Sequence, residues 1–216
     1  AVGKSAGAAI TTGTNNTLVG KEAGDALTTG GDNTAIGLEA LGTATTASGN
    51  TAVGYAALYA NTSGAGNTGI GFQALDANTT AANCTGVGYN VLSANTTGAD
   101  NTALGSQALA ANSTGANNVA VGQLALNDNT TASSNTAVGY NSLAVNTTSG
   151  NNVAIGYGTL AAQTSGGESN TAVGYNAATS NTTGDNLVAI GNQALDANTT
   201  GSGNIAVGRN ALGANT

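Results

Sequence analysis

The sequence has few charged and aromatic side chains and lacks several residue types altogether. Of its 216 residues, 6% are charged and 3% are aromatic, and Pro, His, Met and Trp do not occur. Without histidine, the Ser–His and Cys–His pairs of nucleophilic hydrolases cannot form. The three basic residues, Lys4, Lys21 and Arg209, are too few to neutralise the phosphates of a nucleic acid. A single cysteine excludes an intrachain disulfide framework.

The acidic residues are scattered and form no recurring group. Asp76 and Asp196 share a position in the repeat described below, but seven repeats would place them roughly 34 Å apart. Paired carboxylates of glycoside hydrolases lie about 5–10 Å apart, and calcium-binding β-rolls need an Asp in every turn. We therefore expect that the protein is not an enzyme, that it binds no cofactor, and that it has no catalytic, cofactor-binding or metal-binding residue. No run approaches the roughly 18 apolar residues of a membrane span, so we expect no membrane insertion.

What the chain does contain is a repeat. The hexapeptide "NTAVGY" occurs at 50–55, 135–140 and 170–175, and near-copies fill the intervals. Aligned on the apolar residue before the recurring glycine, which we call the anchor, successive copies lie 17 residues apart, with one step of 18 between Ile155 and Val173. The anchors are Val2, Val19, Ile36, Val53, Ile70, Val87, Leu104, Val121, Val138, Ile155, Val173, Ile190 and Val207.

Each position of the repeat has its own chemistry. Glycine follows every anchor, asparagine usually stands three residues before it, and a Thr/Ser pair follows nine and ten residues after it. A leucine stands five residues after most anchors, at 41, 58, 75, 92, 109, 126, 143, 160, 195 and 212. The extra residue of the long copy falls between Ser165 and Asn170, in a Gly-rich loop.

The repeat predicts an all-β parallel β-solenoid of about 12–13 coils. Seventeen residues are too few for a helical repeat, and polar and apolar residues alternate around the anchor as in a strand. We expect two short strands and two turns per coil, with like residues stacked on like. Residues 1–216 form one array, with atypical coils at 1–35 and regular coils at 36–216. The predicted core ladder is Val53, Ile70, Val87, Leu104, Val121, Val138, Ile155, Val173 and Ile190 with Leu58, Leu75, Leu92, Leu109 and Leu126.

Two stretches carry a resemblance to known repeats. "NTAVGYNSLAVNTTSGNN" (135–152) and "NNVAIGYGTLAAQTSGG" (151–167) resemble the "NTAVGYxALxxNTTG" arrays of tail-fibre-like proteins of bacteria and phages. They are also similar to the "SVAIG" motif of YadA-like adhesin heads. The resemblance covers essentially the whole chain. It implies a left-handed coil and assembly of copies into a homotrimer, while the ends of the array, discussed below, suggest a helical filament of copies.

Three further features have alternative interpretations. Asn61, Asn78, Asn95, Asn112, Asn129, Asn146, Asn181 and Asn198 share one position within N-x-S/T sequons, so they are either candidate glycan acceptors or turn formers that bond their own backbone. Cys84 replaces the stacked asparagine of its coil, either as a small filler or as an interchain disulfide partner. The aromatic residues two positions after the anchor either cover a corner or contact carbohydrate or another chain.

These observations favour a structural subunit of a fibre or filament, located outside the cell, on the cell surface or on a virion surface. We expect it to assemble with copies of itself laterally, end to end, or both, because no polar cap closes either end of the array. The alternative is an adhesin head or surface-binding module, with surface glycans as the partner. Ice is disfavoured, because the paired threonines are adjacent and neighbours on a strand point to opposite faces.

Overall fold

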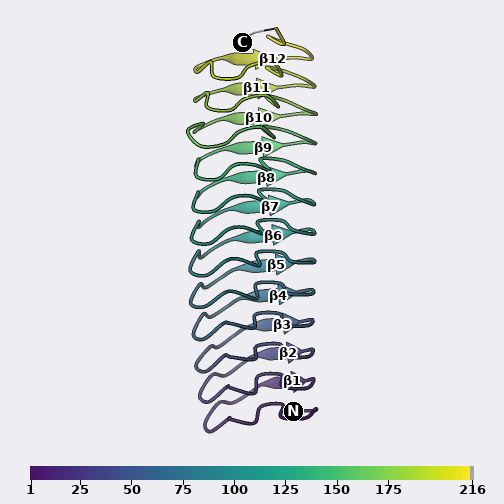
Figure 1. Ribbon diagram of the computed structural model, residues 1–216, viewed down its shortest axis with the longest axis vertical. Helices are drawn as coiled ribbons and strands as arrows, with labels where there is room; N and C mark the ends of the chain where they lie inside the picture. Colours follow the sequence, from purple (N-terminus) through teal and green to yellow (C-terminus); the bar gives the residue numbers. More distant parts are fainter. Residues whose placement is uncertain (215–216) are drawn as a thin grey trace.

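The chain winds into a single β-solenoid, as the repeat predicts. A computed structural model describes residues 1–214, and the last two residues of the predicted array, Asn215 and Thr216, lie outside this range. The coils stack into one column with the two termini at opposite ends (Figure 1). The described residues contain no helix, and hence none that could span a membrane.

Each coil contributes one three-residue strand that ends at the anchor. The strands pair in chain order into one parallel sheet, and every pair has the same register, with anchor opposite anchor. Val2 forms an isolated parallel bridge to Val19 and so begins one more coil below β1. The strands are β1 (Thr17–Val19), β2 (Thr34–Ile36), β3 (Thr51–Val53), β4 (Thr68–Ile70), β5 (Thr85–Val87), β6 (Thr102–Leu104), β7 (Val119–Val121), β8 (Thr136–Val138), β9 (Val153–Ile155), β10 (Thr171–Val173), β11 (Val188–Ile190) and β12 (Ile205–Val207).

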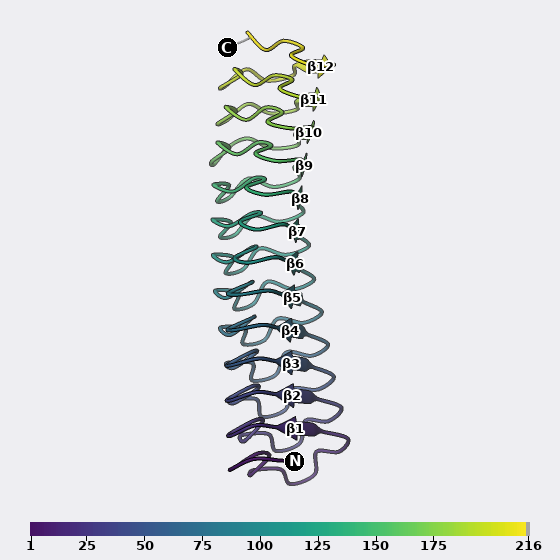
Figure 2. The same ribbon diagram turned by 90° about the vertical axis from the view of Figure 1, so that its right-hand side faces the viewer.

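Backbone hydrogen bonds run along the column around the whole coil. Thr102 N donates to Asn118 O at 2.8 Å beside the strand, and Leu109 N donates to Ala125 O at 3.0 Å on the opposite side. With strands about 4.8 Å apart, the eleven steps from β1 to β12 span roughly 53 Å. The side view shows the same uninterrupted stack from end to end (Figure 2).

The predicted core was correct at the leucines and wrong at the anchors. The five predicted leucines, Leu58, Leu75, Leu92, Leu109 and Leu126, are fully buried. The nine predicted anchors face outward and are half-buried or exposed, and the alanine or glycine at the centre of each strand points inward instead. A 17-residue circuit encloses little space, and one leucine fills it together with the alanines. The corrected positions are Val53, Ile70, Val87, Leu104, Val121, Val138, Ile155, Val173 and Ile190.

The expected second strand is also absent from the described coils. The Ala-Leu segment forms turns, because the residue three after the anchor and the leucine five after it both have left-handed backbone angles, as in Gln107 (φ 58°) and Leu109 (φ 51°). Left-handed angles do not fit a strand. They turn the chain twice within three residues and direct the leucine side chain into the coil.

The atypical first coils fill their interior with a rearranged set. Gly24 stands where later coils have leucine, and Leu27 occupies the position of the buried asparagine. Leu27 and the strand residue Leu18 are both buried, and a Cβ on Gly24 would lie 2.8–2.9 Å from their methyl groups. The missing side chain of Gly24 therefore leaves the space that the side chains of Leu18 and Leu27 occupy.

Candidate functional surfaces

A first ladder of buried asparagines runs along the interior beside the sheet. It consists of the residues three before the anchor, among them Asn101, Asn118 and Asn135. Asn101 Oδ1 accepts the backbone N–H of Asn118 at 2.9 Å, and Asn101 Nδ2 donates to Gly115 O at 2.7 Å. Each side chain thus pairs two polar groups of the next coil. The predicted stacking of asparagines is confirmed.

A second ladder lies next to the first and is formed by the residues eight after the anchor. Asn112 Nδ2 donates to Asn95 Oδ1 at 2.8 Å in the coil below and to Gly115 O at 2.9 Å in its own coil. Gly115 O therefore accepts from both ladders, which joins them into one buried polar network. Such networks stabilise a fold only when their members are satisfied, and most members are paired here.

The second ladder contains all eight predicted glycan acceptors. Asn61, Asn78, Asn95, Asn112, Asn129, Asn146, Asn181 and Asn198 have no exposed surface. The Nδ2 atom that would carry a glycan instead donates a hydrogen bond to the carbonyl oxygen three residues later, as in Asn112. The burial of these eight residues argues against the glycan-acceptor alternative and supports the turn-forming alternative. Of the remaining sequons, Asn15 and Asn83 are exposed.

Two exceptions in the ladders show how strictly the geometry is kept. Cys84 fills a position of the first ladder: its N–H donates to Asn67 Oδ1 at 2.9 Å, and its buried thiol donates to Gly98 O at 3.2 Å. In the 18-residue coil the second ladder has Gln163, whose amide reaches the carbonyl oxygen of Gly167, four residues on rather than three. The longer side chain spans the extra residue.

In most coils the first residue of the Thr/Ser pair forms a hydroxyl ladder at the turn directly after the second asparagine ladder, which we call the far corner. Thr79 Oγ1 donates to Thr96 O at 3.0 Å, and Thr96 Oγ1 donates to Ser113 O at 3.0 Å. The second threonine of the pair, such as Thr97, is exposed. These hydroxyls extend the axial bonding to the outside of the coil.

The outer side of the sheet is a face that sequence reasoning missed. Every strand presents two outward side chains, a first residue that is Thr, Val or Ile and an anchor that is Val, Ile or Leu. No charged residue occurs at either position in β1–β12. We call these two parallel columns the strand face. The alternation of residues along each strand indicates that the sheet has two different faces, but it does not say which face points into the coil.

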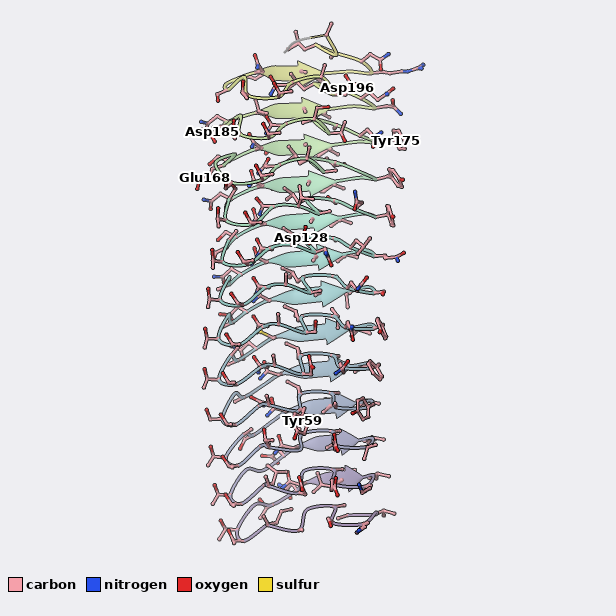
Figure 3. The ribbon with its side chains drawn as sticks, in the orientation of Figure 1. Tyr59, Asp128, Glu168, Tyr175, Asp185 and Asp196 are labelled. Atoms are coloured by element: carbon pink, nitrogen blue, oxygen red, sulfur yellow. The ribbon has the colours of Figure 1, made fainter. Side chains whose placement is uncertain are left out.

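Aromatic side chains form a ridge at the corner after the strand. Tyr55, Phe72 and Tyr89 make one stack and Tyr140, Tyr157 and Tyr175 make another, with ring centroids 5.1–5.4 Å apart. Ser106 and Gln123 take this position in the two coils between the stacks. Tyr175 marks this corner in Figure 3, opposite the edge that carries Glu168 and Asp185. The rings cover one another, so edges and hydroxyl groups face outward.

The titratable groups do not converge. Among residues 1–214, no three His, Cys, Asp or Glu side chains gather in one place, and no pocket opens on the surface. Burial raises the pKa of the Asp76 carboxyl above its usual range, and Asp76 Oδ1 is a buried atom with no hydrogen-bond partner there. Burial also raises the pKa of the Cys84 thiol.

Comparison with protein-family models, with curated proteins and with solved structures gives no match. The functional argument therefore rests on the geometry of the column and its surfaces.

Proposed function

We propose that the chain is a structural subunit of a fibre or filament outside the cell or on a virion surface. The observation that carries the proposal is the continuous hydrogen bonding along the column. All eleven strand pairs keep one register, and buried asparagines link coil to coil. In such a structure every coil contacts only its neighbours, so length scales with the number of coils while the cross-section stays constant. A fibre shaft needs these two properties.

The chemistry of the column suits an environment of variable salt. The described residues contain one ion pair, between Lys21 and Glu22 on the surface, and exposed pairs contribute little to stability. The network is instead neutral and buried, so salt does not screen it. We propose that copies of the chain assemble with one another as a homotrimer or a helical filament, consistent with the resemblance to tail-fibre and adhesin repeats.

Electron microscopy and diffraction of the purified chain test this proposal. We expect rods of constant width that assemble into longer fibres, and an oriented sample should diffract along the fibre axis at about 4.8 Å, since the strands lie across that axis. Short particles that stay separate at all concentrations would argue against a fibre subunit. A salt titration gives a second test: the melting temperature should hardly change between low and high sodium chloride concentration.

The aromatic ridge favours one alternative, a glycan-binding surface module. Tyr55, Phe72 and Tyr89 are 41–52% exposed, and exposed tyrosines combine an apolar ring with a polar hydroxyl group. A glycan array probed with the intact chain and with Tyr157→Ala separates the two functions. Binding that the substitution abolishes would support the module, whereas no binding together with long fibres would support the structural subunit.

A further inference from the structure

The strand face has a regularity that the fold alone does not require. The central, inward-pointing residue of each strand from β2 to β12 is Ala or Gly. Because these side chains are all small, every strand lies at the same depth in the column. The strands lie above one another in a nearly straight column (Figure 1). The outward side chains therefore form a two-dimensional grid, about 4.8 Å along the axis and roughly 6.7 Å across each strand.

The hydroxyl groups of this grid have no partner within the described residues. Eight of the twelve strands begin with threonine, at 17, 34, 51, 68, 85, 102, 136 and 171. The hydroxyls at the far corner donate to the carbonyl of the next coil, as Thr79 and Thr96 do. Those of the strand threonines make no such bond and remain free for solvent. A free hydroxyl column beside a column of exposed methyl groups can both bond and confine water.

The grid is also rigid before any ligand arrives. Threonine, valine and isoleucine are branched at Cβ and have restricted χ1 angles, and backbone bonds fix each strand on both sides. Little conformational entropy is lost when such a surface binds, because it is already ordered. The anchors are accessible for contact: Ile36 is 40% exposed, Leu104 39% and Ile155 39%.

We propose that the strand face binds crystalline water, that is, the surface of ice. A ligand for this face must be neutral, flat and periodic in two directions, because the face is uncharged and has no groove. Ice offers such a surface, because its molecules are neutral, repeat in two directions, and each can both donate and accept hydrogen bonds. Polysaccharide is a weaker fit, since aromatic ring faces that would stack on sugars are absent from the strand face and covered in the ridge.

This inference corrects the location of the surface, which sequence reasoning sought at the Thr/Ser pair. There the first hydroxyl is consumed by the axial ladder, and the two threonines are adjacent. On the strand face the two outward residues are separated by one inward residue, as the geometry of a strand requires. The proposal does not depend on fibre assembly, since a single rod presents the whole face.

Thermal hysteresis and partition into slowly grown ice test the proposal on the intact chain. The test substitution is Thr102→Tyr, which places a large ring in the middle of the grid at β6. The matched control is Thr97→Tyr, which adds the same ring at an exposed threonine of the far corner. We expect the unmodified chain and the control to depress the freezing point and enter the ice, and the β6 variant to lose most of both activities.

Circular dichroism confirms the fold of each variant, and Thr136→Lys on β8 repeats the test with a charge in case the tyrosine perturbs folding. No hysteresis and no ice partition for the unmodified chain would overturn the proposal, and so would equal activity of the β6 variant and the control. Sedimentation addresses the competing occupant, a second copy of the chain. If Thr102→Tyr only dissociates an oligomer and leaves ice activity unchanged, the face is a subunit interface and the proposal is wrong.

Discussion

Asn112→Ala tests whether the buried asparagine network stabilises the column. Asn112 lies in the fifth regular coil and makes three side-chain hydrogen bonds, to Asn95 Oδ1 at 2.8 Å, to Gly115 O at 2.9 Å and from Asn129 Nδ2 at 2.7 Å. Gly115 O keeps a second donor in Asn101, and Asn129 Nδ2 keeps Ala132 O as an acceptor. Asn95 Oδ1 loses its partner and stays buried.

The expected loss follows from these bonds. A net contribution of about 1 kcal/mol for each of the three bonds and a penalty of about 1–3 kcal/mol for the orphaned oxygen give a total of about 4–6 kcal/mol. For a chain of this length each kcal/mol lowers the melting temperature by about 2–4 °C, so a cooperative transition should fall by roughly 8–24 °C. Asn112→Asp should cost more, because the aspartate cannot donate and would be a buried charge.

The control is Asn127→Ala, at a position where the neighbouring coils already have Ala110 and Ala144. The Asn127 side chain makes one exposed bond, to Asp128, so its loss should change stability by less than about 0.5 kcal/mol. Urea and thermal denaturation followed by circular dichroism measure both variants, and hydrogen exchange locates the loosened coils. If Asn112→Ala and Asn127→Ala melt together, the ladder does not stabilise the column and the reasoning fails.

Three further predictions use other positions. Gln163→Asn shortens the amide that reaches the Gly167 carbonyl and should cost about 1–3 kcal/mol in urea denaturation, because the 18-residue coil then lacks a donor. Gly139→Ala should cost about 3 kcal/mol or more, since φ is 132° and the new Cβ would collide with the carbonyl oxygen of Gly156; a normal melting curve would contradict this. Asp76→Asn should stabilise the chain at pH 7, because the raised pKa means that folding favours the protonated carboxyl. The contribution of Asp76 to folding stability is therefore greatest below the ordinary pKa of aspartate and is lost as pH rises through the raised value. The unmodified chain and Asp76→Asn should consequently have similar stability in acid.

The sequence was sufficient for the architecture because the period is a global signal. Thirteen aligned anchors specify a strand at each anchor, parallel pairing and constant register, and the structure has all three, although the second strand expected in each coil is absent from the described residues. The 18-residue step also falls where expected, and Gln163 and Gly166 (φ 107°) accommodate it. None of these conclusions depends on knowing which way a side chain points.

Orientation was the part that sequence reasoning could not decide. Strand alternation separates Thr102 and Leu104 from Ala103 but does not say which side is inside, and hydrophobicity suggested the anchor. The decision comes from Leu109, whose left-handed backbone turns it into a narrow interior with no room for a second large side chain. The choice between glycan acceptor and turn former stayed open in the sequence for a related reason, since Asn112 looks like a surface turn until its carbonyl partner is known.

The two asparagine ladders explain why the repeat is so strict. Alanine and leucine would tolerate a shifted coil, because apolar contacts are not directional. An asparagine would not, since Asn101 and Asn112 must both reach the oxygen of Gly115 while also contacting the neighbouring coil. A one-residue slip would break both ladders at once and bury unpaired amides. Single interruptions such as Cys84 and Leu187 are accepted because the backbone N–H of each still donates to the asparagine below it, at 2.9 Å in both cases. The polar interior thus fixes the register, and a fixed register is what gives the strand face its regular grid.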